Sequence, residues 1–173
     1  MKAIPAAVER LARALAILGG LALLAVTALT VASITGRAFT AHGLGPIPGD
    51  FELVEALTAF AVFAFLPWCQ LKRGHATVDV FTRLLPERAN RLIDLACEVL
   101  MALAVALIAW RLWHGMLDKM RYQETSFILQ FPLWWAFAAA WAAAAAGVIV
   151  AVYAAWLRLR DLLAPPGAAE DAS

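Results

Sequence analysis

Charged residues are rare along this chain, and the gaps between them define four long apolar segments. No Asp, Glu, Lys or Arg occurs in residues 14–36 or in residues 125–157. Residues 51–71 and 92–113 carry only a few charges, all near their ends. A helix needs roughly 20 apolar residues to cross the hydrocarbon core of a bilayer. Each of the four segments is therefore long enough to span a membrane.

The same pattern predicts helices rather than strands. Backbone amides within lipid must be hydrogen-bonded inside the protein, so membrane-spanning segments are helices or closed barrels. The alternating pattern typical of barrel strands is absent from the sequence. We therefore predict an all-α, polytopic integral membrane protein. Its four transmembrane helices are expected at about residues 14–36, 51–71, 92–113 and 131–157.

The composition supports a membrane protein and argues against a soluble domain. Of 173 residues, 64% are hydrophobic and 16% are charged, and the mean hydropathy is +0.77, values outside the range of typical soluble domains. The 14 Lys and Arg nearly balance the 13 Asp and Glu, so the net charge does not indicate a nucleic-acid-binding protein. We expect one membrane domain over residues 1–163 and a disordered tail at 164–173.

Basic residues are distributed unevenly between the two sides of the predicted helices. Ten lie before the first helix, between the second and third, or after the fourth, whereas four lie on the opposite side. Because Lys and Arg concentrate in cytoplasmic loops, both termini are predicted to be cytoplasmic. The first apolar run is too long for the hydrophobic core of a signal peptide, so we expect it to remain as a helix.

The sequence contains no recognisable arrangement of catalytic or cofactor-binding residues. Its Cys and His residues lack the spacing of a zinc site, and no His lies where it could be an axial haem ligand at mid-membrane. A Gly-rich phosphate-binding loop and a Ser/His/Asp arrangement are also absent. We therefore expect no enzymatic activity, cofactor or metal.

Acidic residues near the helix ends are the main candidates for function, because an ionisable residue is costly to insert in a membrane. Glu52 and Glu55 lie three residues apart on one helical face, with Arg37 across a short loop. They form either an ion pair joining the first two helices, or a contact with a partner protein or an ion pathway. For Asp94 and Glu98, pairing with the neighbouring basic loop is favoured over a proton relay.

The loop after the second helix contains the run Gly-His-Ala-Thr-Val-Asp at residues 74–79. Gly74 permits a turn after the helix, and Asp79 can cap a short helix whose apolar face lies on the membrane surface. We therefore predict an interfacial amphipathic helix between helices 2 and 3. For His75, a loop-fixing or interface role is favoured over proton handling.

These features resemble the small membrane subunit of tripartite ATP-independent periplasmic (TRAP) transporters, the DctQ-type small permease. That family is similar in an Arg after the first helix, here Arg37, in a Glu-Leu opening the second, here Glu52 and Leu53, and in the Gly-His-x-x-Val-Asp run at 74–79. The resemblance covers about residues 15–155. Glu55 departs from the family, which often has a basic residue shortly after the Glu-Leu.

The resemblance implies that this chain is a scaffold of a secondary transporter and does not itself form the substrate pathway. In such systems a large multi-helix subunit moves the substrate, coupled to an ion gradient, usually sodium. A periplasmic binding protein delivers an organic acid such as a dicarboxylate. The expected location is the bacterial inner membrane. The candidate partner-interface or structural residues are Arg37, Glu52, Glu55, Gly74, His75, Asp79, Asp94 and Glu98.

Two other functions remain open on the residues alone. A small transporter could act by itself as a homo-oligomer, although the first helix has no carboxylate at its centre that could couple transport to protons. The chain could also anchor an extramembrane enzyme to the membrane. Uptake or efflux by the isolated chain would distinguish the first alternative from a scaffold.

Overall fold

The computed structural model describes residues 6–72 and 87–163, and this part of the chain is helical apart from its loops. Each of the four long helices is long and apolar enough to cross a membrane. The prediction of an all-α chain with four such helices is therefore confirmed. The elements are α1 (Ala6–Ala38), the short 3₁₀ helix η1 (Thr40–His42), α2 (Asp50–Leu71), α3 (Glu87–Arg121) and α4 (Trp134–Leu163).

Two predicted features lie outside the described residues. The predicted interfacial helix, with Gly74, His75 and Asp79, falls within residues 73–86. The predicted disordered tail falls within residues 164–173.

The helices extend beyond the predicted membrane-crossing segments. Residues 14–36 lie within α1 and residues 92–113 lie within α3, which continues to Arg121. A gap between charges marks the part of a helix that lipid tolerates. The helix itself can continue beyond the gap, because Arg, Lys and Glu are good helix formers. Helix α4 begins later than expected because the preceding residues form a loop, in which the Leu133 amide donates to the Glu124 carbonyl (3.0 Å).

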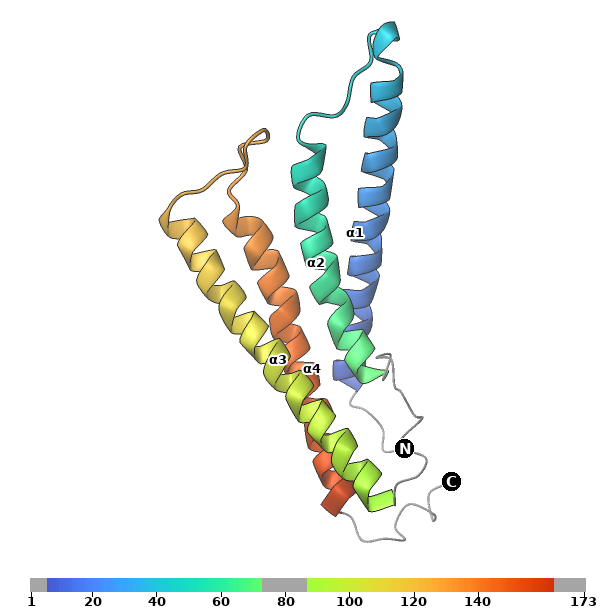
Figure 1. Ribbon diagram of the computed structural model, residues 1–173, viewed down its shortest axis with the longest axis vertical. Coiled ribbons are helices and arrows are strands. Elements are labelled where there is room, and N and C mark those ends of the chain that lie inside the picture. The colour runs from blue at the N-terminus through green and yellow to red at the C-terminus, as the bar shows by residue number, and fades with distance from the viewer. Residues whose placement is uncertain (1–5, 73–86, 164–173) are drawn as a thin grey trace.

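The four helices pack in the order α1, α2, α4, α3. Helices α2 and α3 both pack against α4, but they make no extensive contact with each other, and α1 packs mainly on α2. Figure 1 shows that α1 and α2 diverge from α3 and α4 toward the loops opposite the chain termini. We call the end of the molecule with residues 39–49 and 122–133 the loop end, and the opposite end the terminal end.

Small side chains allow α4 to pack at the centre of this arrangement. Ala143, Ala144 and Val150 are almost completely buried. Gly147 lies where a Cβ atom would be 3.5 Å from Val105 of α3 and 3.8 Å from Pro67 of α2. Close approach through small residues is the usual way in which helices associate in lipid. The large apolar side chains instead cover the outer surface, including Leu21, Leu24 and Ile34 of α1 and Leu100, Leu103 and Leu107 of α3.

Candidate functional site at the loop end

The first polar contact at the loop end joins α1 to α2. The Ser33 hydroxyl, buried in α1, donates a hydrogen bond to the Asp50 carboxylate at the start of α2. The same hydroxyl oxygen accepts a hydrogen bond from the Ile47 amide (3.3 Å). The other carboxylate oxygen of Asp50 accepts the Phe51 amide (2.8 Å). These bonds hold the connection between α1 and α2 close to both helices.

The connection between α3 and α4 folds into a narrow hairpin-like loop. The Ser126 amide donates to the Phe131 carbonyl (2.9 Å), and the Thr125 hydroxyl donates to the Gln130 side chain (3.0 Å). At its base, Lys119 forms an ion pair with Glu124 at 2.5 Å. The tip of this loop presents Phe127, which is 91% exposed.

Glu52 joins this loop to α2. Its two carboxylate oxygens accept hydrogen bonds from the backbone amides of Ile128 (2.6 Å) and Leu129 (2.9 Å). Hydrogen bonds to an ionised acceptor are stronger than those between neutral groups. The Leu129 side chain lies against Gly49, where a Cβ atom would be 2.4 Å from Leu129 Cγ and where the backbone φ is +76°. Glu52 therefore connects the two helical pairs where they diverge, and we call this contact the Glu52 clasp.

The predicted ion pair between Arg37 and Glu52 is wrong. The Glu52 carboxylate is taken up by the two loop amides. Arg37 is exposed and lies within electrostatic range of Asp50, not of Glu52. Within residues 6–72 and 87–163, Arg37 forms no ion pair. The physical reason is that two nearby N–H donors satisfy a carboxylate better than an exposed arginine beyond the intervening loop.

A cavity of about 490 Å³ lies beneath the Glu52 clasp. Its walls come from α2, α4, one residue of α3 and the 125–133 loop, and they are mostly apolar. Glu52 and Glu55, predicted to share a helical face, both line this cavity. Glu55 makes no hydrogen bond or ion pair with any residue that the structure describes. The loop end therefore contains one carboxylate used in folding and one available for a ligand or partner.

The other two acidic candidates lie toward the terminal end. The Gln70 side-chain amide of α2 donates a hydrogen bond to the Glu98 carboxylate of α3, so Glu98 contributes to the contact between these helices. Asp94 is exposed one turn earlier. The loop predicted to pair with both lies largely within 73–86, outside the described residues. The structure therefore does not bring Asp94 and Glu98 together with Glu52 and Glu55.

Sequence reasoning missed several residues of these contacts. Asp50 and Gln70 received no role, although a polar side chain within an apolar segment is a usable signal. Among the hydroxyls of α1, Ser33 bonds to the neighbouring helix α2, whereas Thr27 donates to the Leu23 carbonyl of its own helix (2.8 Å). The backbone amides of residues 126–129 cannot be singled out from the sequence, because every residue except proline carries a backbone N–H.

Four helices that are long and apolar enough to span a membrane define the class of the chain, a multi-pass membrane protein. A family model described as "Tripartite ATP-independent periplasmic transporters, DctQ component" matches residues 26–161. The chain therefore belongs to the DctQ family and is a small membrane subunit of a TRAP transporter, a transporter component and not an enzyme. This confirms the resemblance inferred from the motifs. Neither the search of curated proteins nor that of solved structures gave a match.

Proposed function

We propose that this chain is the scaffold subunit of a TRAP transporter that imports organic acids such as dicarboxylates, driven by a sodium gradient. It acts with a large transport subunit and a periplasmic substrate-binding protein in the bacterial inner membrane. Membership in the DctQ family supports the tripartite assembly. The excess of Lys and Arg at the terminal end supports cytoplasmic termini and a periplasmic loop end.

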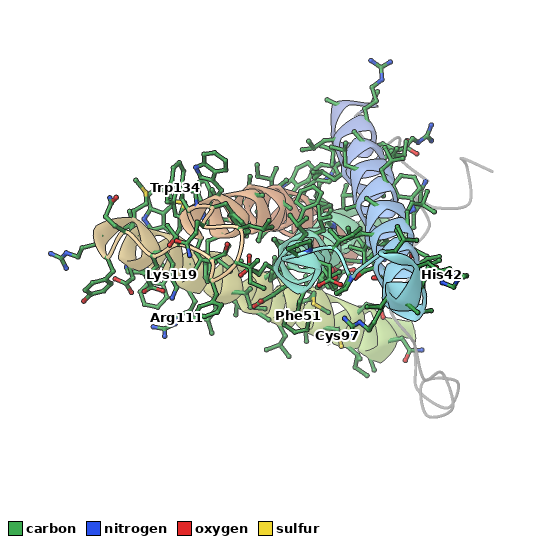
Figure 2. All side chains as sticks on the ribbon, turned by 90° about the horizontal axis from the view of Figure 1, so that it is seen from above. His42, Phe51, Cys97, Arg111, Lys119 and Trp134 are labelled. Atoms are coloured by element: carbon green, nitrogen blue, oxygen red, sulfur yellow. The ribbon has the colours of Figure 1, made fainter. Side chains whose placement is uncertain are left out.

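The observation that carries a scaffold role is an arginine on the outward face of α3. Leu100, Leu103 and Leu107 are more than half exposed on this face, and Arg111 is exposed one turn beyond Leu107. Figure 2 shows the Arg111 side chain on the side of α3 that faces away from α4. Between Leu100 and Arg111, this face is therefore apolar except for the one arginine, and no other helix of the described residues packs on it.

The depth of Arg111 in the membrane can be derived from its neighbours. The Trp113 and Trp141 rings lie 4.8 Å apart between centroids, and Trp141 is seven residues into α4. At about 1.5 Å per residue, Arg111 lies roughly 13 Å from the loop end of α4. If Trp134 and Trp135 at that end mark the headgroup region, Arg111 lies inside the hydrocarbon core, which is about 30 Å thick, and deeper than its place near the end of the predicted segment 92–113 implies. An arginine at the membrane centre costs on the order of 2.5–3.5 kcal/mol.

An acidic group on a neighbouring protein would remove this cost. Arg111 has no ion pair with any acidic residue in the described part of the chain. A carboxylate of the large subunit, facing Arg111 between the two proteins, would pair with the guanidinium away from lipid. The outward face of α3 is therefore our proposed contact surface for the large subunit, with the leucines providing apolar area and Arg111 providing specificity.

Co-purification with the large subunit tests this contact. Arg111→Glu should reduce recovery of the large subunit about tenfold or more, because it places two like charges together. Arg121→Glu is the matched control, because Arg121 is also exposed on α3 but lies at its end, and it should leave recovery unchanged. Arg111→Gln separates the loss of attraction from repulsion and should have an intermediate effect. Equal recovery with Arg111→Glu and the wild type would overturn the proposed contact.

Transport by the reconstituted complex tests the rest of the proposal. Uptake of a dicarboxylate should require the binding protein and an inward sodium gradient, and it should stop when potassium replaces sodium. Uptake by this chain alone in liposomes would instead support the alternative, a self-sufficient homo-oligomeric transporter. Uptake that persists without a sodium gradient would overturn sodium coupling.

A further inference from the structure

The cavity at the loop end is part of a groove whose floor is α4. Helices α2 and α3 both pack on α4 without extensive contact with each other, and the cavity is lined by residues of all three helices. Ala56, Ala59 and Phe63 form the α2 wall, and Ala140 forms part of the floor. The 125–133 loop borders the cavity at the loop end, and farther down Pro67 and Val105 both lie next to Gly147 of α4. We call this mostly apolar cavity between α2, α3 and α4 the slot.

Two polar side chains at the slot, Ser126 and Glu55, have no hydrogen bond of normal geometry to any residue that the structure describes. The Ser126 side chain is only 5% exposed, and its hydroxyl oxygen lies near the Glu52 carboxylate without a hydrogen bond of normal geometry to any described group. Glu55 is exposed at the slot and has no partner among the described residues. Buried hydroxyls are normally hydrogen-bonded, and a carboxylate next to lipid requires a cation or water. Both groups therefore point to a ligand that is polar at one end and apolar at the other.

The position of Glu55 along the membrane normal indicates where the polar end of such a ligand lies. Helices α2 and α4 both run away from the loop end (Figure 1), and Pro67 lies beside Gly147. Counting back along each helix, Glu55 is level with the first residues of α4, Trp134 and Trp135. Tryptophan side chains prefer the headgroup region of a bilayer. Glu55 therefore lies at headgroup level, and the slot continues roughly 12 Å deeper, to Phe63.

We propose that this slot binds one phospholipid with an amine headgroup, such as phosphatidylethanolamine. Its ammonium group pairs with Glu55, a polar headgroup atom hydrogen-bonds to the Ser126 hydroxyl, and one acyl chain lies between α2 and α3 over the small floor residues. The negative charge of Glu55 disfavours an anionic headgroup that has no ammonium group, such as phosphatidylglycerol. The lipid would fill the space between the two helical pairs. Its binding would not depend on which large subunit is bound.

Native mass spectrometry of the full chain tests this site. The protein would be released from micelles containing equal amounts of phosphatidylethanolamine and phosphatidylglycerol, and the lipid retained by each chain would be counted. The wild type should retain one phosphatidylethanolamine, about tenfold more often than phosphatidylglycerol. Glu55→Gln should remove this preference. Asp118→Asn, which neutralises an exposed acid of α3 outside the slot, should preserve it.

A second variant tests the acyl-chain position independently. Ala59→Phe adds a ring into the slot from an exposed position, so the helices should stay folded while retention of both lipids falls. Equal retention of the two lipids by the wild type would overturn the proposal, as would an unchanged preference in Glu55→Gln or unchanged retention in Ala59→Phe. Loss of the lipid when the large subunit is added would show that a protein segment occupies the slot in the complex, and this would also overturn it.

Discussion

Helices α1 and α4 are both apolar enough to span a membrane, yet they occupy opposite environments. In the most apolar 18 residues of each helix, 11% of α1 is buried within the protein, compared with 33% of α4. Helix α1 packs mainly on α2, whereas α4 packs on both α2 and α3. Overall hydrophobicity therefore identifies a spanning helix but does not tell whether lipid or protein surrounds it.

Side-chain size accounts for this difference. The buried residues of α1 are Ala12, Gly19, Ala22 and Ser33, a single stripe of small side chains. In α4, the buried small residues cover a wider arc of the helix surface and include Ala143, Ala144, Ala146 and Gly147. In lipid, helices gain from close backbone approach more than from apolar area. A helix with a narrow stripe of small residues packs on one neighbour, and a helix with a wider one can pack on two.

The largest effect should follow from a large side chain at the centre of α4. Ala144 is completely buried, so Ala144→Leu would force α4 away from its neighbours and cost about 1–3 kcal/mol or more. The midpoint of thermal unfolding in detergent should fall by several degrees. Ala142→Leu is the matched control on the exposed side of the same helix. If both variants unfolded at the same temperature, small residues would not determine the role of α4.

A smaller effect is expected at the stripe of α1, because only one neighbouring helix is affected. A Cβ atom at Gly19 would lie 3.1 Å from Ala64 Cβ of α2, whereas nothing lies within 4 Å of one at Gly20. Gly19→Leu should therefore lower the unfolding midpoint, by less than Ala144→Leu. Gly20→Leu should leave it unchanged or raise it slightly, because leucine has a higher helix propensity than glycine. The reverse order would place the contact with α2 on a different face of α1.

The number and type of the helices could be predicted from the sequence, but their order in space could not. Long gaps between charges have few physical explanations besides membrane spans. The order α1, α2, α4, α3 depends on how side chains fit between particular pairs of helices. That fit leaves only a weak sequence signal, the small residues of α4.

The candidate site was likewise only partly predictable. The spacing of Glu52 and Glu55 predicted a shared face, and both residues line the same cavity. Their different uses could not be predicted, because Glu52 binds backbone amides 76 and 77 residues away. Such donors are identical at almost every position, so only the folded loop distinguishes them.

The Glu52 clasp predicts a local effect rather than a global one. Glu52→Gln would replace a charged acceptor of two amides by a neutral one and should cost about 1 kcal/mol at the loop. Hydrogen exchange of the Ile128 and Leu129 amides should therefore accelerate by severalfold, up to about tenfold. Asp118→Asn is the matched control, since Asp118 is an exposed acid outside the cavity that accepts no amide of this loop. Unchanged exchange in Glu52→Gln would show that the loop keeps its position without the carboxylate.

The smallest effect should come from the charged contacts between α1 and α2 at the terminal end. Glu9 pairs with Lys72 at 3.1 Å and with Arg13 at 3.5 Å, and all three side chains are partly exposed. Exposed ion pairs contribute only about 0–1 kcal/mol, so Glu9→Gln should shift the unfolding midpoint no more than Arg10→Gln, a control on the same helix. A shift as large as that of Gly19→Leu would mean that charge, and not the small stripe, holds α1 on α2. Helices α1 and α4 would then differ in the kind of contact that holds them, ion pairs for α1 and small-residue packing for α4, and not in the amount of small-residue packing.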